Sequence, residues 1–150
     1  MTDLHMPTLR QARIGDWAMI RALLLESGLP VDDLDAEKAR DFLVAEDESE
    51  VIGLIGLQLC DRIGLLRSLV VAKKARSLGL GGKLVGSLEA AAQAAGVTEL
   101  WLLTIDAEKF FGRHGFEMAE RDAAPASIQQ TEEFSDLCPG TAFLMRKSLA

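Results

Sequence analysis

The sequence predicts an α/β (α+β) domain with one mixed central sheet and helices on both faces. In the first half of the chain, short runs of alternating apolar and polar residues are typical of antiparallel strands. In the middle, an apolar run, a glycine-rich turn and an amphipathic helix predict a strand–helix–strand unit with parallel strands. A chain of 150 residues can bury about 70% of its unfolded surface without metals or disulfides, so we expect a single domain over residues 1–150.

The first half contains three predicted strands and two predicted helices. The strands cover 8–13, 42–46 and 51–59, and the last two form a hairpin. Asp16 can cap the longer helix, which Gly28 and Pro30 end, and a short helix is expected over 36–40. The apolar face of the longer helix consists of Trp17, Ile20, Leu24 and Leu25.

The second half begins with the strand–helix–strand unit. Its predicted elements are a strand over 65–71, a helix over 81–95 that Gly96 ends, and a strand over 99–104. The buried face of that helix is expected to comprise Leu84, Leu88, Ala91 and Ala95. We then expect a short helix from Asp106 to Arg113, a turn or helix after Pro125, and a last strand over 141–146.

The composition excludes several classes of protein. A net charge of −7 argues against general binding to nucleic acid, which requires clustered Lys and Arg. The apolar runs are too short for a membrane span, and the first residues show no secretory signal, so the expected location is cytoplasmic. Cys60 and Cys138 lie far apart and have no metal-binding neighbours, so we expect no metal site and no disulfide framework.

The charge is distributed unevenly along the chain. Nine acids lie between Asp32 and Glu50, whereas six bases and no acid lie between Arg62 and Lys83. The basic segment indicates either a local anion site or a solvated basic face.

The basic segment contains a glycine turn. After the strand that ends at Val71, a link over 73–76 leads to Gly79, Gly81 and Gly82 and to a helix that opens near Lys83. Backbone N–H groups in such a turn, together with the positive end of the helix dipole, can bind a phosphate. A lysine in the first helical turn opposes that dipole unless an anion lies there, so the turn is predicted to hold one.

Two common phosphate-binding motifs do not fit this spacing. A P-loop requires glycine at Ser77 and Ser or Thr at Leu84. A dinucleotide-binding fingerprint requires its first glycine directly after the strand, where the basic link stands.

The turn resembles motif A of the GNAT superfamily of N-acetyltransferases, Arg/Gln-x-x-Gly-x-Gly/Ala, through Arg76, Gly79 and Gly81. The segment 107–116, Ala-Glu-Lys-Phe-Phe-Gly-Arg-His-Gly-Phe, is similar to the family's second cofactor segment, and the likeness covers roughly residues 8–147. It implies a GNAT-like fold, acetyl-CoA (CoA) as cofactor, a small-molecule amine as acceptor, and a homodimer as the usual assembly.

The resemblance also implies which residues bind the cofactor. The pantetheine arm would pair with the backbone of Leu69, Val70 and Val71. The pyrophosphate would be held by Arg76, Ser77, Leu78, Gly79, Leu80, Gly81, Gly82 and Lys83. The thioester end would be lined by Thr104, Phe110 and Phe111.

Two branches of the family are similar to this chain. Segments 103–104, 110–111, 115–116 and 144–147, with Pro125, resemble amino-acid N-acetyltransferases that include acetylglutamate synthase. Segments 66–71 and 134–139 resemble small acetyltransferases that accompany arsenic-resistance genes. The arginine usual in the first branch is replaced by Asp106, and a glutamate usual before motif A falls at Leu65, so the likeness does not carry glutamate over as substrate.

The chemistry requires a deprotonated amine, a stabilised oxyanion and a protonated thiolate. Backbone N–H groups near Val71 can supply the oxyanion donor. Many GNAT enzymes have a tyrosine as the acid where Phe111 stands, but this chain has no tyrosine, so Ser68 or an ordered water would protonate the thiolate.

The remaining candidates have two interpretations each. Arg67 can bind a substrate carboxylate or pair with an acid, and His114 is better explained as a helix cap than as a base.

Two alternative functions stay open. Because the tyrosine is missing, a non-catalytic acyl-CoA-binding or sensing module is the main alternative function. The second alternative is a protein N-acetyltransferase.

Overall fold

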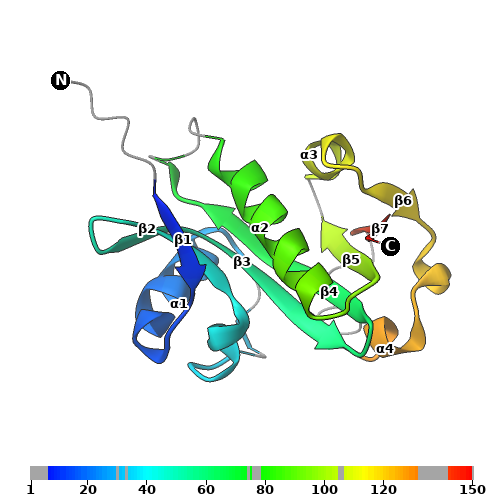
Figure 1. Ribbon diagram of the computed structural model, residues 1–150, viewed down its shortest axis with the longest axis horizontal. Helices are drawn as coiled ribbons and strands as arrows, with labels where there is room; N and C mark the ends of the chain where they lie inside the picture. Colours follow the sequence, from blue (N-terminus) through cyan, green and yellow to red (C-terminus); the bar gives the residue numbers. More distant parts are fainter. Residues whose placement is uncertain are drawn as a thin grey trace. The chain divides into compact units, whose positions relative to one another are not determined.

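The computed structural model describes residues 7–29, 31–32, 34–73, 75, 79–104, 107–131 and 142–149 (Figure 1). The chain forms two compact units, which we call the first unit (Met1–Gly56 and Ser68–Leu88) and the second unit (Leu57–Arg67 and Glu89–Ala150). The expectation of a single domain stays a prediction. Strands form a mixed seven-stranded sheet in the order β1-β2-β3-β4-β5-β7-β6, so the mixed sheet predicted from the sequence is confirmed.

The first unit contains an antiparallel array of strands. Strand β1 (Thr8–Gln11) pairs with β2 (Leu43–Asp47), which pairs with β3 (Glu50–Cys60). The β2–β3 hairpin closes through Glu48 and Ser49, whose φ values of 50° and 69° match the twist of a tight two-residue turn. The expected hairpin is therefore confirmed.

Helix α1 (Trp17–Glu26) covers one face of β3 in the first unit. Its residues Ile20 and Leu24 are fully buried in a core cluster that also holds Leu54 of β3. Such i, i+4 spacing places one stripe of the helix on the sheet. The prediction of the stripe is wrong at Leu25, which is 48% exposed because it lies on the opposite side of the helix from Ile20.

Helix α2 (Leu80–Ala94) covers the other face of β3. A side chain at Gly53 would approach Leu80 and Leu84 to 3.2 Å, and successive strand residues point to opposite faces, so Gly53 faces α2 while Leu54 faces α1. Helices therefore lie on both faces of β3. The expected buried face of α2 is wrong at Ala91 and Ala95, which are exposed, and Ala92 takes the place in the core.

Two short 3-10 helices of the first unit bear on the predicted elements. The η2 helix (Lys38–Asp41) confirms the short helix expected there. The η1 helix (Ile14–Asp16) directly precedes α1, and within it the Asp16 side chain has a different role from the expected cap of α1. The Asp16 carboxylate does not cap α1, because it accepts the backbone N–H of Arg13 at 2.7 Å instead.

The second unit holds the parallel pair predicted from the sequence. Strand β4 (Ile63–Val71) pairs in parallel with β5 (Glu99–Thr104) over Ile63–Leu65 and Glu99–Trp101. Strand β7 (Phe143–Ser148) runs antiparallel to β5, and the short edge strand β6 (Glu117–Ala119), which the sequence pattern did not predict, pairs with β7.

Short helices complete the second unit. Within the described part of this unit they are α3 (Glu108–Arg113), η4 (Arg121–Ala123) and α4 (Ala126–Gln129). Ile128 of α4 joins Leu65, Trp101 and Leu144 in a buried cluster. Among the helices that the structure describes, none is long and apolar enough to cross a membrane.

Candidate functional site

Ser68 of strand β4 has left-handed backbone geometry, a departure from the strand conformation that we call the kink. This residue has a φ of 63°, which is uncommon for a residue other than glycine, and it is buried. A left-handed residue inside a strand is typical of a β-bulge, which redirects the backbone groups that follow. Beyond the kink, Leu69 and Val71 are half-buried while Val70 is buried. The kink therefore falls at the start of the segment 69–71 expected to pair with pantetheine.

The glycine turn leads directly into α2 in the first unit. Gly79 is exposed with a φ of 69°, a conformation that suits glycine, and Lys83 N donates to Gly79 O at 3.4 Å, as at the start of a helix. Leu80, Gly81 and Gly82 are the first residues of α2, and the amides at the start of an α-helix point along its axis toward whatever lies before it. This arrangement fits an anionic group at that end.

The helix expected from residue 81 is confirmed, because Gly81 and Gly82 belong to the first turn of α2. The side chain of Leu80 is buried in the core, so only the backbone of Leu80 could contact a ligand. Lys83 is exposed in the same helical turn. Arg76, Ser77 and Leu78 lie outside the described residues.

In the second unit, Thr104 ends β5 and fixes the start of α3. Its hydroxyl oxygen accepts a hydrogen bond from Ala107 N at 3.0 Å. Asp106, expected to cap this helix, lies outside the described residues, and the N-cap position is Ala107. The threonine hydroxyl thus satisfies one of the amides at the helix start.

The aromatic residues of α3 form a compact cluster. The Phe111 ring is 5% exposed and packs edge-on against Phe110 (centroids 5.1 Å apart) and Phe116 (5.6 Å). Phe110 is half-buried, and its ring lies 4.6 Å from that of His114. The three candidates for the thioester end, Thr104, Phe110 and Phe111, therefore come together around α3.

His114 occupies the C-cap position of α3, as expected. Its carbonyl oxygen accepts a hydrogen bond from Lys147 Nζ at 2.8 Å, and the same ammonium lies 2.9 Å from Glu89 Oε2. These contacts explain His114 as a structural residue.

The remaining candidate residues are Arg67 and the two cysteines. Arg67 of β4 is 4% exposed, which is unusual for arginine and agrees with a role that requires a fixed guanidinium. Cys60 is half-buried beside the α4 cluster, and burial raises the pKa of its thiol, which makes it a poor nucleophile. Cys138 lies outside the described residues.

The structure adds a pocket that the sequence pattern did not reveal. It is an open hollow of about 710 Å³ in the first unit, lined by Gln11, Ala12, Arg13, Ile14, Gly15 and Arg40. The antiparallel register places Gln11 opposite Leu43, at the end of β1 and β2 away from the glycine turn. This pocket is therefore separate from the expected pyrophosphate site.

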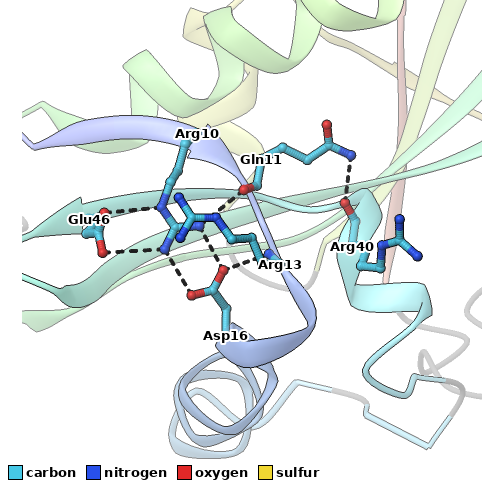
Figure 2. A network of polar contacts seen from close by, with 6 residues as sticks. All are labelled: Arg10, Gln11, Arg13, Asp16, Arg40 and Glu46. Atoms are coloured by element: carbon cyan, nitrogen blue, oxygen red, sulfur yellow. Dashed lines mark hydrogen bonds and ion pairs between the residues drawn. The ribbon is translucent and has the colours of Figure 1, made fainter.

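A network of ion pairs supports the wall of this pocket. Arg10 binds both carboxylate oxygens of Asp16, at 2.8 and 2.9 Å, and also reaches Glu46 at 3.2 Å (Figure 2). The Gln11 amide donates to the carbonyl oxygen of Arg40 at 2.9 Å. These contacts fix the positions of β1, η1 and η2 relative to one another.

Comparisons with known proteins agree on one family. The model of the acetyltransferase (GNAT) domain family matches residues 38–118. An uncharacterised N-acetyltransferase of Chlorobaculum tepidum is 34% identical over 93 residues, which are 61% of this chain and 59% of that protein. The chain thus spans about three-fifths of the length of this curated relative.

Solved structures share the fold at low sequence identity. N-acetylglutamate synthase from Neisseria gonorrhoeae, complexed with coenzyme A and N-acetyl-glutamate, aligns with a TM-score of 0.84 and 21% identity, over 99% of this chain and 36% of that one. A Mycobacterium tuberculosis protein in complex with CoA aligns with a TM-score of 0.81 and 23% identity, over 96% and 100% of the two chains. At these identities the likeness establishes the fold.

Proposed function

We propose that this chain, which belongs to the acetyltransferase (GNAT) domain family, is an acetyl-CoA-dependent N-acetyltransferase acting on the amine of a small molecule. One observation carries this proposal: the family match over 38–118 contains both the glycine turn and the α3 segment. The solved neighbours bound to coenzyme A support the same cofactor.

Each part of the site has a proposed role. Acetyl-CoA supplies the acetyl group as an activated thioester. The amides at the start of α2, with Arg76, Ser77, Leu78, Gly79 and Lys83, would hold the pyrophosphate. The backbone of Leu69, Val70 and Val71 would hold the pantetheine arm, and a backbone N–H of this kinked segment would stabilise the oxyanion.

Thr104, Phe110 and Phe111 would surround the thioester. Ser68, whose hydroxyl lies at the kink, would donate the proton to the departing thiolate. A thiol has a pKa of about 8–9, so a weak donor such as a serine or a water is sufficient for this step. Arg67, already buried in β4, would bind a carboxylate of the acceptor, which favours an amino acid or a similar compound.

Several finer points stay predictions of the resemblance or the composition. These are a link to arsenic resistance, a homodimeric state and a cytoplasmic location. The alternative functions are a non-catalytic acyl-CoA-binding or sensing module, which the missing tyrosine favours, and a protein N-acetyltransferase.

Thiol release during incubation with acetyl-CoA separates these functions. The acceptors are free amines, single amino acids and peptides with free N-termini. The proposal expects turnover on at least one small amine and little on the peptides. Tight binding of CoA without turnover on any acceptor would support the sensor, and turnover on peptides alone would support the protein acetyltransferase.

A further inference from the structure

Glu108 carries a carboxylate oxygen for which the fold provides no partner. Its Oε2 is shielded from solvent and accepts no hydrogen bond. The residue as a whole is half-buried, so the carboxylate lies at the border between the interior and the solvent. A sheltered charge without a partner is unfavourable for folding, and such a group in a native structure requires an explanation.

The position of Glu108 connects it to the proposed thioester end. It is the first residue of α3, directly after Ala107, whose amide is held by the Thr104 hydroxyl. Residues three apart on a helix lie on the same side, so Glu108 lies one turn before Phe111 on the same side of α3. Phe111 is the position at which related enzymes place their tyrosine, and it brings no titratable group here.

The other charged groups on and against α3 do not neutralise Glu108. Lys109 and Arg113 are exposed on α3, and Lys147 is bound to Glu89 and to the carbonyl oxygen of His114 at the far end of the helix. Within the described residues, Glu108 therefore has no cation of the protein as a partner.

We propose that Glu108 binds the ammonium group of the acceptor and takes its proton, an inference that rests on the proposed acetyl transfer. Near neutral pH most aliphatic amines carry a proton, and only the neutral amine is a nucleophile. One N–H proton passes to the Glu108 carboxylate. The freed lone pair then forms the C–N bond to the acetyl carbon as the C–S bond breaks. Ser68 gives its hydroxyl proton to the departing sulfur, and the second proton on nitrogen replaces it. Glu108 finally releases its proton to water.

If Glu108 serves catalysis and not folding, replacing it should hardly change the melting temperature of the protein. Replacing it with an uncharged side chain of similar size removes the sheltered charge. The negative charge at the start of α3 also interacts favourably with the helix dipole, and this offsets the gain, so Glu108→Gln and Glu108→Met should melt within about 2 °C of wild type. A structural role for Glu108 predicts a fall in melting temperature of more than about 2 °C.

The test uses two small nucleophiles that differ in charge near neutral pH: ethylamine, which is an ammonium ion, and hydroxylamine, which is neutral. For wild type, Glu108→Gln and Glu108→Met, we would measure melting temperature, acetyl-CoA affinity by calorimetry, and thiol release with each nucleophile. Glu120→Gln is the control, because Glu120 is an exposed carboxylate of the same unit. The Glu108 variants should lose about 10²-fold or more with ethylamine, keep the hydroxylamine rate within a few-fold, and bind acetyl-CoA like wild type.

Each other outcome overturns the inference or the function separately. Equal losses with both nucleophiles, no loss with either, or a melting temperature lower by more than about 2 °C would overturn the role of Glu108. A wild type that binds acetyl-CoA but acetylates neither nucleophile would overturn the acetyl transfer itself, and with it the role of Glu108. A wild type that does not bind acetyl-CoA would instead remove the proposed function on which the inference rests.

Discussion

The hydroxyl of Thr104, the last residue of β5, accepts the backbone N–H of Ala107 at 3.0 Å and so fixes where α3 begins. The expected consequence concerns Thr104→Val, which keeps the shape but leaves this amide without an acceptor. The loss of a side-chain cap destabilises a helix by about 0.5–2 kcal/mol, so we expect a melting temperature lower by about 2–6 °C. Thr104→Ser keeps the acceptor and should melt like wild type. Equal melting of the valine variant and wild type would contradict this role.

The kink at Ser68 allows its hydroxyl to be tested apart from its backbone conformation. Ser68→Gly accepts a φ of 63° without strain, so the backbone should keep its conformation at this position. If the hydroxyl protonates the thiolate, this variant should turn over about 10²–10⁴-fold more slowly. Steady-state rates of Ser68→Gly and Ser68→Ala decide the matter. Wild-type turnover of the glycine variant would assign the proton to water.

The start of α2 should be sensitive to added negative charge. Gly81 is helical and has no positive φ, so Gly81→Glu should preserve a cooperative melt, since an acid near a helix N-terminus is favourable by about 0.3–1 kcal/mol. It would place a carboxylate against the pyrophosphate and should weaken acetyl-CoA binding by about 100-fold or more.

A matched control for Gly81→Glu exists on the same helix. Gly86 is exposed, and nothing lies within 4 Å of the position of its Cβ, so Gly86→Glu adds the same charge away from the turn. Calorimetric titration of acetyl-CoA should give wild-type affinity for this control. Wild-type affinity for Gly81→Glu as well would remove the glycine turn from the site.

The stability of the first unit should depend on pH through Asp16. Hydrogen bonds from Arg10 hold the pKa of Asp16 below its ordinary value of 3.8. A carboxylate with a lowered folded pKa stabilises the fold above its unfolded pKa and loses this contribution as the pH falls through the folded pKa. Asp16→Asn should therefore reduce the free energy of unfolding by about 1–3 kcal/mol near pH 7, and the difference should shrink below about pH 3.

Urea unfolding at the two pH values measures this difference. Glu37→Gln is the control, because the Glu37–Arg40 pair is exposed and should contribute less than about 0.5 kcal/mol. An equal deficit of Asp16→Asn at both pH values would show that its charge is not what stabilises the fold.

The sequence predicted long elements better than short ones. Strand β5 (Glu99–Thr104) has the predicted bounds, because its run of apolar residues marks it. Helix α2 is marked by its hydrophobic period and by the glycine at its end, and it begins only one residue earlier than expected. The three residues of β6 are too few to show a period, and their pairing with β7 is a tertiary property. Asp16 has a cap-like position in the sequence, but its carboxylate is bound by Arg10 of β1, which Glu46 of β2 also binds.

The candidate site was predictable where a local motif marks it. The glycine turn and the Gly-Phe segment after α3 stand out in the sequence because their spacing is fixed by backbone geometry. The positive φ of Ser68 and the unpartnered oxygen of Glu108 have no local signal, since they result from packing around β4 and α3. The same holds for the pocket beside Arg13, whose wall joins segments from 11 to 40.

Acetyl-CoA recognition by this fold is tested most directly by ligand-dependent melting. At about 100 times the dissociation constant, a ligand that binds only the folded state adds about 2.7 kcal/mol, or about 5–10 °C for a chain of this size. We expect such a shift with acetyl-CoA and a much smaller one with ATP or NAD at the same concentration, because the turn after β4 matches neither a P-loop nor a dinucleotide fingerprint. Equal stabilisation by ATP, or no shift with acetyl-CoA, would contradict the assignment.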